Sequence, residues 1–306
     1  MYKMPSKPFV LCKLTNNCNQ NCVHCFTAAC EGGIKNLELN DLKKALDDII
    51  ELDNNTVISF IGGEATVWPN FYNIITDDKY KKALNKKINT NGTAIPEDKY
   101  IEFTKANFFE VRLSLDSNEP YEHDYLRGEG TFAKTVESIK KFKELGLTVS
   151  TGTVISKLNY KKIPEIIEYI KSLGIEVMHF FTFVPVGRGN THSELVLTPE
   201  ERKEVCEIIK KYVPDGKIHN EPLCGEGTCY FNISNEGDVF INFCNDELQK
   251  KKLGNLKEVS FKDVYLKEIS KEEYDIVDCQ KCPYNNDPIM CSNMHSFCIA
   301  DLDLRN

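Results

Sequence analysis

The chain lacks an apolar run of the roughly 20 residues that a membrane-spanning helix needs, and Met1–Pro8 lacks the apolar core of a signal peptide. It also lacks an excess of basic residues, because Asp and Glu number 46 against 38 Lys and Arg, for a net charge of -8. These absences argue against membrane insertion, secretion and general nucleic-acid binding, and they predict a cytoplasmic protein.

Cysteine, in contrast, is abundant. The 306 residues include 13 cysteines in two groups, Cys12 to Cys30 and Cys224 to Cys298, with only Cys206 between them. In a reducing cytoplasm, clustered cysteines indicate metal binding or catalysis rather than disulfides. The sequence therefore predicts a metal-bearing region towards each end of the chain.

Strand-like and helix-like segments alternate along the first two-thirds of the chain. We expect strands at Phe9–Leu14, Thr56–Ile61, Lys86–Asn89, Phe109–Leu115, Thr148–Ile155 and Val177–Phe183. We expect helices near Leu39–Leu52, Phe71–Leu84, Glu97–Lys105, Phe132–Leu145 and Tyr160–Leu173. Strands that alternate with helices form a parallel sheet, and these units are too few for a closed barrel of about eight. The pattern predicts an α/β fold, a partial (β/α)6 barrel with its chemistry at the C-terminal ends of the strands.

The composition of the chain changes after a helix expected at Thr198–Tyr212, which has Thr198 as its N-cap. The remaining residues are short on helix and rich in cysteine, and they contain one clear hairpin, Tyr230–Ser234 with Asp238–Phe243. We therefore predict two domains: a barrel over residues 1–212 and a C-terminal cysteine-rich iron–sulfur domain over residues 213–306.

Three cysteines, Cys18, Cys22 and Cys25, follow the first expected strand within one short loop. Iron–sulfur clusters usually take four cysteines, so three leave one iron open, as catalysis at a metal requires. From spacing alone, structural zinc with His24 or Cys30 as fourth ligand is an alternative.

This C-x3-C-x2-C loop resembles the signature of the radical S-adenosylmethionine (radical SAM) superfamily. The resemblance implies a 4Fe–4S cluster on Cys18, Cys22 and Cys25 whose open iron binds S-adenosylmethionine (AdoMet). It also implies that His24, before the last cysteine, lies against the adenine.

Further motifs of that superfamily occur in its order at successive strand ends. They are Gly62-Gly63-Glu64, Thr90-Asn91-Gly92, Ser114-Leu115-Asp116, Arg127-Gly128 and Pro185-Val186-Gly187-Arg188. The resemblance implies that AdoMet is bound by Gly62, Gly63, Glu64, Asn91, Ser114, Asp116 and Arg127. It assigns no role to the last segment.

The second group of cysteines resembles the SPASM domain of radical enzymes that modify peptides and proteins, including peptide maturases and anaerobic sulfatase-maturing enzymes. Its members are Cys224, Cys229, Cys244, Cys279, Cys282, Cys291 and Cys298. The resemblance implies two auxiliary 4Fe–4S clusters, which need about eight thiolates. One iron is then open or bound by His295, Asp301 or Asp303; a single auxiliary cluster and a zinc ribbon are alternatives.

The resemblance implies an enzyme that abstracts a hydrogen atom from a peptide or protein. The leading outcome is a thioether or carbon–carbon crosslink in a ribosomally synthesised peptide. A formylglycine-generating sulfatase maturase, a peptide epimerase and a non-catalytic metal-binding scaffold are alternatives. The catalytic group stays unknown, with Asp246 and Cys12 as candidates, although core packing suits Cys12 better. The implied partners are the peptide or protein substrate and an electron donor such as flavodoxin or ferredoxin.

Overall fold

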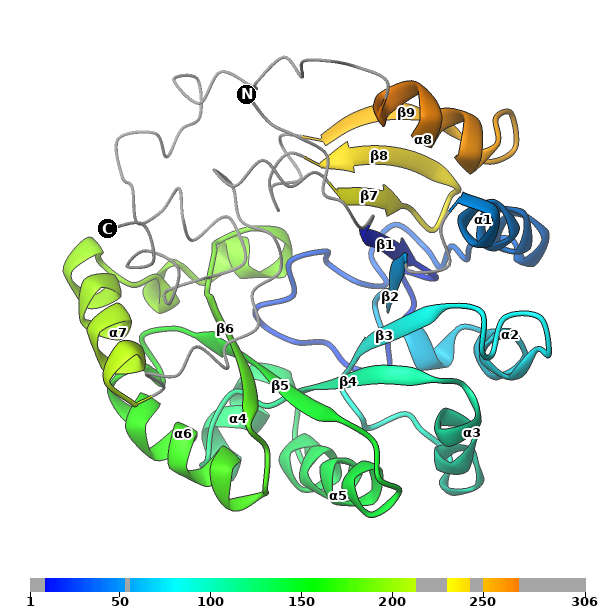
Figure 1. The fold of residues 1–306 in the computed structure, drawn as a ribbon. Coiled ribbons are helices and arrows are strands. Elements are labelled where there is room, and N and C mark those ends of the chain that lie inside the picture. Colours follow the sequence, from blue (N-terminus) through cyan, green and yellow to red (C-terminus); the bar gives the residue numbers. More distant parts are fainter. Residues whose placement is uncertain (1–8, 53–55, 213–229, 243–249, 270–306) are drawn as a thin grey trace.

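A curved parallel sheet organises the structure. The computed structural model describes residues 9–52, 56–212, 230–242 and 250–269 (Figure 1). The first six strands are β1 Phe9–Lys13, β2 Val57–Ile61, β3 Asn85–Thr90, β4 Phe108–Ser114, β5 Val149–Ile155 and β6 Val177–Thr182. They lie in the order β6-β5-β4-β3-β2-β1, and every neighbouring pair is parallel. The partial α/β barrel predicted from the sequence is confirmed.

Helices cover the outer side of this sheet (Figure 1). They are α1 Leu39–Leu52, α2 Phe71–Thr76, α3 Tyr100–Lys105, α5 Thr131–Glu144, α6 Ile163–Ser172 and α7 Pro199–Tyr212. The helix α4 Pro120–Arg127 follows β4, and the Leu126 carbonyl at its end accepts the backbone N–H of Val23 at 2.8 Å. In α1 the buried residues Leu42, Ala45, Leu46 and Ile49 recur at helical spacing, so one face of the helix packs on the sheet. None of the helices described is long and apolar enough to cross a membrane.

The strand register gives the sheet two faces of different character. Cys12 pairs with Phe60, and Phe60 pairs with Ile88, so these three side chains share one face and join the main hydrophobic core. Alternate residues point the other way. Among them, Asn89 pairs with Arg112, and both line a cavity on the inner face. Cys12 therefore belongs to the apolar side of the sheet, and burial raises the pKa of its thiol.

The helix expected over Phe71–Leu84 is wrong in its second half. The helix α2 ends at Thr76, and turns follow. Asp77 ends it because its carboxylate accepts a hydrogen bond from the backbone N–H of Lys79 at 3.0 Å. Such a local side-chain bond offers the backbone an alternative to the helix.

The described C-terminal residues extend the barrel sheet. The predicted hairpin is present as β7 Tyr230–Ile233 and β8 Asp238–Asn242, and β9 Lys250–Asn255 follows it. The strand β7 pairs in parallel with β1, which produces one continuous nine-stranded sheet. The division at residues 212 and 213 stays a prediction, since residues 213–229 lie outside those described.

One helix in this part, α8 Phe261–Ile269, was not expected from the sequence. Ser260 precedes it, and its hydroxyl accepts the backbone N–H of Asp263 at 3.0 Å, as an N-terminal cap does. The Phe261 ring meets Phe231 of β7 edge to face at 5.5 Å. The helix is thus stabilised by the strand that extends the barrel.

Candidate active site

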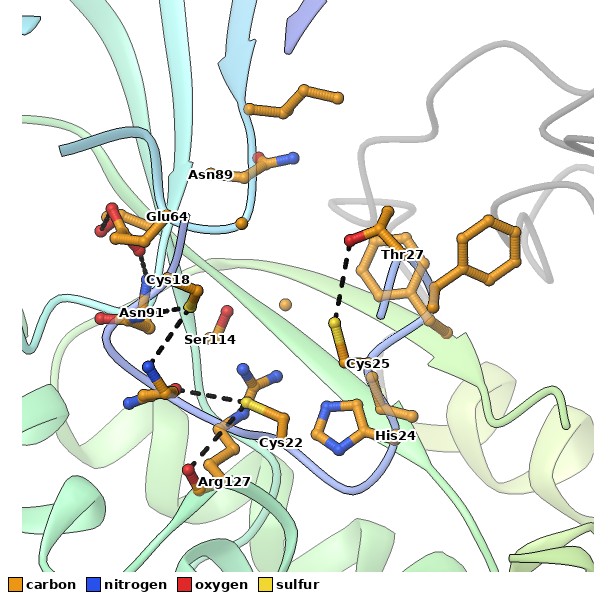
Figure 2. Close-up of a pocket in the computed structure, with 18 of the residues that line it drawn as sticks. Cys18, Cys22, His24, Cys25, Thr27, Glu64, Asn89, Asn91, Ser114 and Arg127 are labelled. Carbon is orange, nitrogen blue, oxygen red and sulfur yellow. Dashed lines mark hydrogen bonds between the residues drawn. The ribbon is translucent and has the colours of Figure 1, made fainter. Parts of the chain in front are cut away.

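A cavity of about 450 Å³ opens at the C-terminal ends of the parallel strands. Of the residues singled out in the sequence as ligands, it is lined by Cys18, Cys22, His24, Cys25, Gly62, Gly63, Glu64, Asn91, Ser114 and Arg127 (Figure 2). Asp116 does not line it. Residues from separate loops and strands therefore meet around one space.

The thiols lie in the loop of residues 14–30, here called the cysteine loop. The Cys18 sulfur accepts the backbone N–H of Gln20 at 3.4 Å, and the Cys25 sulfur accepts that of Ala29 at 3.4 Å. Hydrogen bonds to the sulfurs are among the features by which proteins tune iron–sulfur clusters. Burial raises the pKa of the Cys18 thiol to about 12. Metal binding requires the thiolate form of cysteine.

The arrangement suits a cluster better than a single zinc ion. In the described ranges, no three His, Cys, Asp or Glu side chains are close enough to hold one metal ion. Cys30, a candidate fourth zinc ligand, is exposed and does not line the cavity. Its sulfur instead accepts the backbone N–H of Cys18 at 3.3 Å. In a 4Fe–4S cluster each thiolate binds a different iron, so the three thiols need not converge on a single ion.

Two glycines allow the end of β2 to approach the cysteine loop. A Cβ on Gly63 would lie 2.4 Å from the Asn17 carbonyl oxygen, and one on Gly62 would lie 2.8 Å from that of Thr15. The backbone N–H of Gly63 donates to the Thr15 carbonyl at 2.8 Å. The glycines are therefore needed for contact between two protein segments, besides any approach to a ligand.

Glu64 connects the ends of two neighbouring strands. Its carboxylate accepts hydrogen bonds from Thr66 N at 3.0 Å, Thr66 Oγ1 at 2.8 Å, Thr90 Oγ1 at 2.8 Å and Asn91 N at 2.8 Å. Burial raises the pKa of this carboxyl, and the four donors oppose that shift. Because the side chain is 2% exposed, these bonds hold the turns after β2 and β3 together.

We expect Glu64→Ala to lower the free energy of unfolding by about 2–4 kcal/mol, because buried donors lose their acceptor. Glu64→Gln keeps an acceptor for the two threonines but turns an amide group towards Asn91 N–H, so we expect a loss of about 1 kcal/mol. Urea unfolding of the metal-free proteins measures both. Equal stability of Glu64→Ala and the wild type would contradict this role.

The turn after β3 holds the cysteine loop from the same side. The Asn91 side chain donates to Asn19 Oδ1 at 2.9 Å. Thr93 Oγ1 accepts hydrogen bonds from Asn19 at 2.8 Å and from Gln20 at 3.1 Å. The sequence motif indicated Asn91 but not Thr93 or Gln20, since their contact joins residues more than 70 positions apart.

Asp116 acts on the cavity through its neighbours. Arg127 donates to its carboxylate through Nε at 2.5 Å and Nη2 at 3.2 Å, and His24 Nε2 lies 3.5 Å away. Burial opposes ionisation of Asp116, but the charge of Arg127 lowers its pKa to about 2. Asp116 thus contacts Arg127 and His24, which do line the cavity, and its predicted contact with the cofactor stays a prediction.

His24 is neutral in this setting, because burial lowers its pKa to about 4. Its Nδ1 has no hydrogen-bond partner in the part of the chain that the structure describes. With the other ring nitrogen near Asp116, an acceptor atom remains on the ring beside Cys25 (Figure 2).

The loop after β6 contacts the cysteine loop from the opposite side. Arg188 donates through Nε to the Cys22 carbonyl at 3.0 Å and through Nη1 to the Ala29 carbonyl at 2.7 Å. The motif around it was visible in the sequence, but the contact was not.

The remaining predicted residues lie outside those described. They are the ligand candidates Cys224, Cys229, Cys244, Cys279, Cys282, Cys291, Cys298, His295, Asp301 and Asp303, and the catalytic candidate Asp246. Their roles stay predictions. Cys12 is described and lies in the hydrophobic core away from the cavity, which favours packing over hydrogen-atom transfer.

A family model described as Radical SAM superfamily matches residues 12–170, which is more than half of the chain. The chain belongs to the radical SAM superfamily. The family membership predicted from the cysteine loop is thus confirmed, and the protein is a radical SAM enzyme. Membership implies AdoMet and a 4Fe–4S cluster as cofactors.

Relatives within the superfamily differ in what their names say they act on. The chain is 27% identical over 241 residues to an AdoMet-dependent heme synthase of Methanosarcina barkeri, covering 76% of this chain and 66% of that protein. It is 27% identical over 209 residues to the subtilosin biosynthesis protein AlbA of Bacillus subtilis, covering 67% of this chain and 46% of AlbA. The chain thus spans about half to two-thirds of the length of these two curated relatives.

A solved structure shares the fold. The crystal structure of Streptococcus suis SuiB bound to its precursor peptide SuiA gives a TM-score of 0.69 at 18% identity, over 93% of this chain and 71% of SuiB. At this identity the similarity shows the fold alone.

Proposed function

We propose that this protein abstracts a hydrogen atom from a peptide or protein substrate and installs a thioether or carbon–carbon crosslink in a ribosomally synthesised peptide. The cavity at the strand ends carries the proposal, because three thiols, a glycine pair and an arginine from distant parts of the sequence line one space. The names of AlbA, a bacteriocin biosynthesis protein, and of SuiB with its precursor peptide support a peptide substrate.

The proposed ligands of the radical cluster are Cys18, Cys22 and Cys25. When bound, the cluster and AdoMet supply one-electron cleavage chemistry that ends in hydrogen-atom abstraction. The residues of the chain itself bind and orient AdoMet. Ser114 and Arg127 are proposed to hold the polar end of AdoMet, and His24 to lie beside its adenine. Arg127 suits an anionic group, since Asp116 holds its guanidinium in a fixed orientation from behind.

The second group of cysteines is proposed to bind two auxiliary 4Fe–4S clusters. Cys229 directly precedes β7 in the sequence, and β7 pairs with β1, the strand that precedes the cysteine loop. The catalytic group stays unknown, with Asp246 as a candidate. A flavodoxin or ferredoxin is the proposed electron donor.

A second candidate is an enzyme that acts on a tetrapyrrole, which the heme synthase relatives favour by name. The two candidates differ in the substrate carbon that loses hydrogen. They share the cluster and AdoMet, so a test must follow the hydrogen atom.

Deuterium transfer distinguishes them. We expect anaerobically reconstituted protein with dithionite and AdoMet to release 5′-deoxyadenosine. With small peptides from cells grown on deuterated amino acids, the product should carry deuterium, as mass spectrometry detects. A matched deuterated tetrapyrrole extract should leave it unlabelled. Label from the tetrapyrroles alone would contradict the peptide proposal, and absence of 5′-deoxyadenosine would contradict radical chemistry on this chain.

A further inference from the structure

The loop after β6 crosses the open side of the partial barrel. The strands β1 and β6 stand at opposite ends of the six parallel strands and do not pair with each other. The cysteine loop follows β1, and Arg188 follows β6. Three hydrogen bonds join the two loops: Arg188 Nε to Cys22 O at 3.0 Å, Nη1 to Ala29 O at 2.7 Å, and Arg188 N to Cys25 O at 3.1 Å.

A close backbone contact at Gly187 fixes the position of the Arg188 backbone. Gly187 has φ +56, and a Cβ there would lie 2.4 Å from the carbonyl oxygens of Cys25 and Phe26. Only glycine combines this left-handed conformation with this approach. The sequence order Gly187-Arg188 therefore brings a cationic side chain against the backbone that carries two of the three proposed cluster ligands.

The charge of Arg188 is directed at the thiol loop. Its side chain is 15% exposed and lines the cavity, and its donors point at backbone carbonyls. The carboxylate of Glu31 lies 3.6 Å from Nη1, but Glu31 is 63% exposed, and solvent weakens such a pair.

We propose that Arg188 is a positioning residue for the radical cluster, holding the cysteine loop across the open side of the barrel and making the cluster easier to reduce. This inference rests on the proposed binding of a cluster by Cys18, Cys22 and Cys25. Reduction adds one negative charge to the cluster, and a fixed positive charge nearby stabilises the reduced form. Net charge and hydrogen bonding around the sulfurs are known determinants of cluster potential.

Redox titration followed by electron paramagnetic resonance tests the electrostatic part. In Arg188→Gln, we expect the equilibrium constant for one-electron reduction of the radical cluster to fall about tenfold, a potential lower by about 59 mV. Arg188→Lys keeps the charge and should shift the potential by less than half as much. Lys105→Gln removes one positive charge at the exposed end of α3 and serves as the matched control, for which we expect no shift.

Hydrogen–deuterium exchange of the metal-free proteins tests the positioning part without any cluster. Arg188→Gln and Arg188→Lys both lose the two-carbonyl contact, so amides of residues 18–30 should exchange several-fold faster than in the wild type. The Lys105→Gln protein should exchange as the wild type does. This measurement applies even if one variant binds no iron.

The outcomes distinguish a failure of the proposed role of Arg188 from a failure of the proposed function. Equal potentials in Arg188→Gln and Lys105→Gln, or unchanged exchange of residues 18–30 in both Arg188 variants, would overturn the role of Arg188. A potential lowered as much in Arg188→Lys as in Arg188→Gln would also overturn it, because charge would then not be the cause. Absence of any barrel cluster in the wild type would instead refute the proposed function.

Discussion

Replacing Cys18, Cys22 and Cys25 together by alanine is expected to abolish release of 5′-deoxyadenosine and to remove about four irons per chain, the content of one 4Fe–4S cluster. With both proposed auxiliary clusters present, the wild type should hold about twelve irons and the triple variant about eight. Iron analysis and anaerobic product chromatography measure the two effects. The triple variant lacks all three proposed thiolate ligands, so the barrel cluster loses its whole protein ligand set.

Cys30→Ser is the matched control for the triple variant. Cys30 belongs to the same loop, but its side chain is exposed and outside the cavity. We expect its iron content and product release to stay within about twofold of the wild type, since the cluster is complete with three thiolates. Loss of metal in Cys30→Ser, with zinc in place of iron in the wild type, would favour the structural zinc site. Continued AdoMet cleavage by the triple variant would refute the ligand assignment.

Gly63→Ala is expected to remove the barrel cluster and lower 5′-deoxyadenosine release at least about 100-fold, although every ligand is kept. The new methyl group would lie 2.4 Å from the Asn17 carbonyl oxygen and 2.8 Å from that of Asn16. Both contacts are with backbone, so the cysteine loop must move. Asn17 adjoins Cys18, and displacement of about 1 Å at a reacting site costs roughly 100-fold in rate.

Gly152→Ala provides the comparison, since Gly152 lines the same cavity and also lies at a strand. A Cβ there would meet only side-chain atoms, Arg112 Cδ and Phe181 Cε2, each at 3.4 Å. We expect its iron content to equal that of the wild type. Unfolding of Gly63→Ala is checked by circular dichroism, because overpacking costs about 1–3 kcal/mol. A folded Gly63→Ala protein with a full barrel cluster would show that this glycine serves only the approach of a ligand.

The alternation of strands and helices was readable from the sequence because each type of element has its own hydrophobic period. Five of the helices recur near their predicted positions, and the hairpin at residues 230–242 is present. The prediction of a helix at Phe71–Leu84 is wrong in its second half for a local reason. Its hydrophobic pattern continues past Thr76, but the Asp77 side chain competes for backbone N–H groups.

The pairing of the hairpin with the barrel sheet could not be predicted from the sequence. A parallel pair such as β1 with β7 joins segments more than 200 residues apart, and no short-range pattern marks such a partner. The helix α8 was missed for a related reason, since it is stabilised by packing of Phe261 on β7 as well as by its cap at Ser260.

By itself the sequence determined the chemistry class, because the spacing of Cys18, Cys22 and Cys25 and the order of motifs at strand ends are properties of the chain alone. Which side chains meet was decided by the tertiary structure. Strand register turned Cys12 to the apolar face, and folding placed Asp116 behind Arg127 and Arg188 against the cysteine loop. The physical reason is range: ligand type and local period are encoded within a few residues, whereas contacts across the barrel depend on how the whole sheet curves and packs.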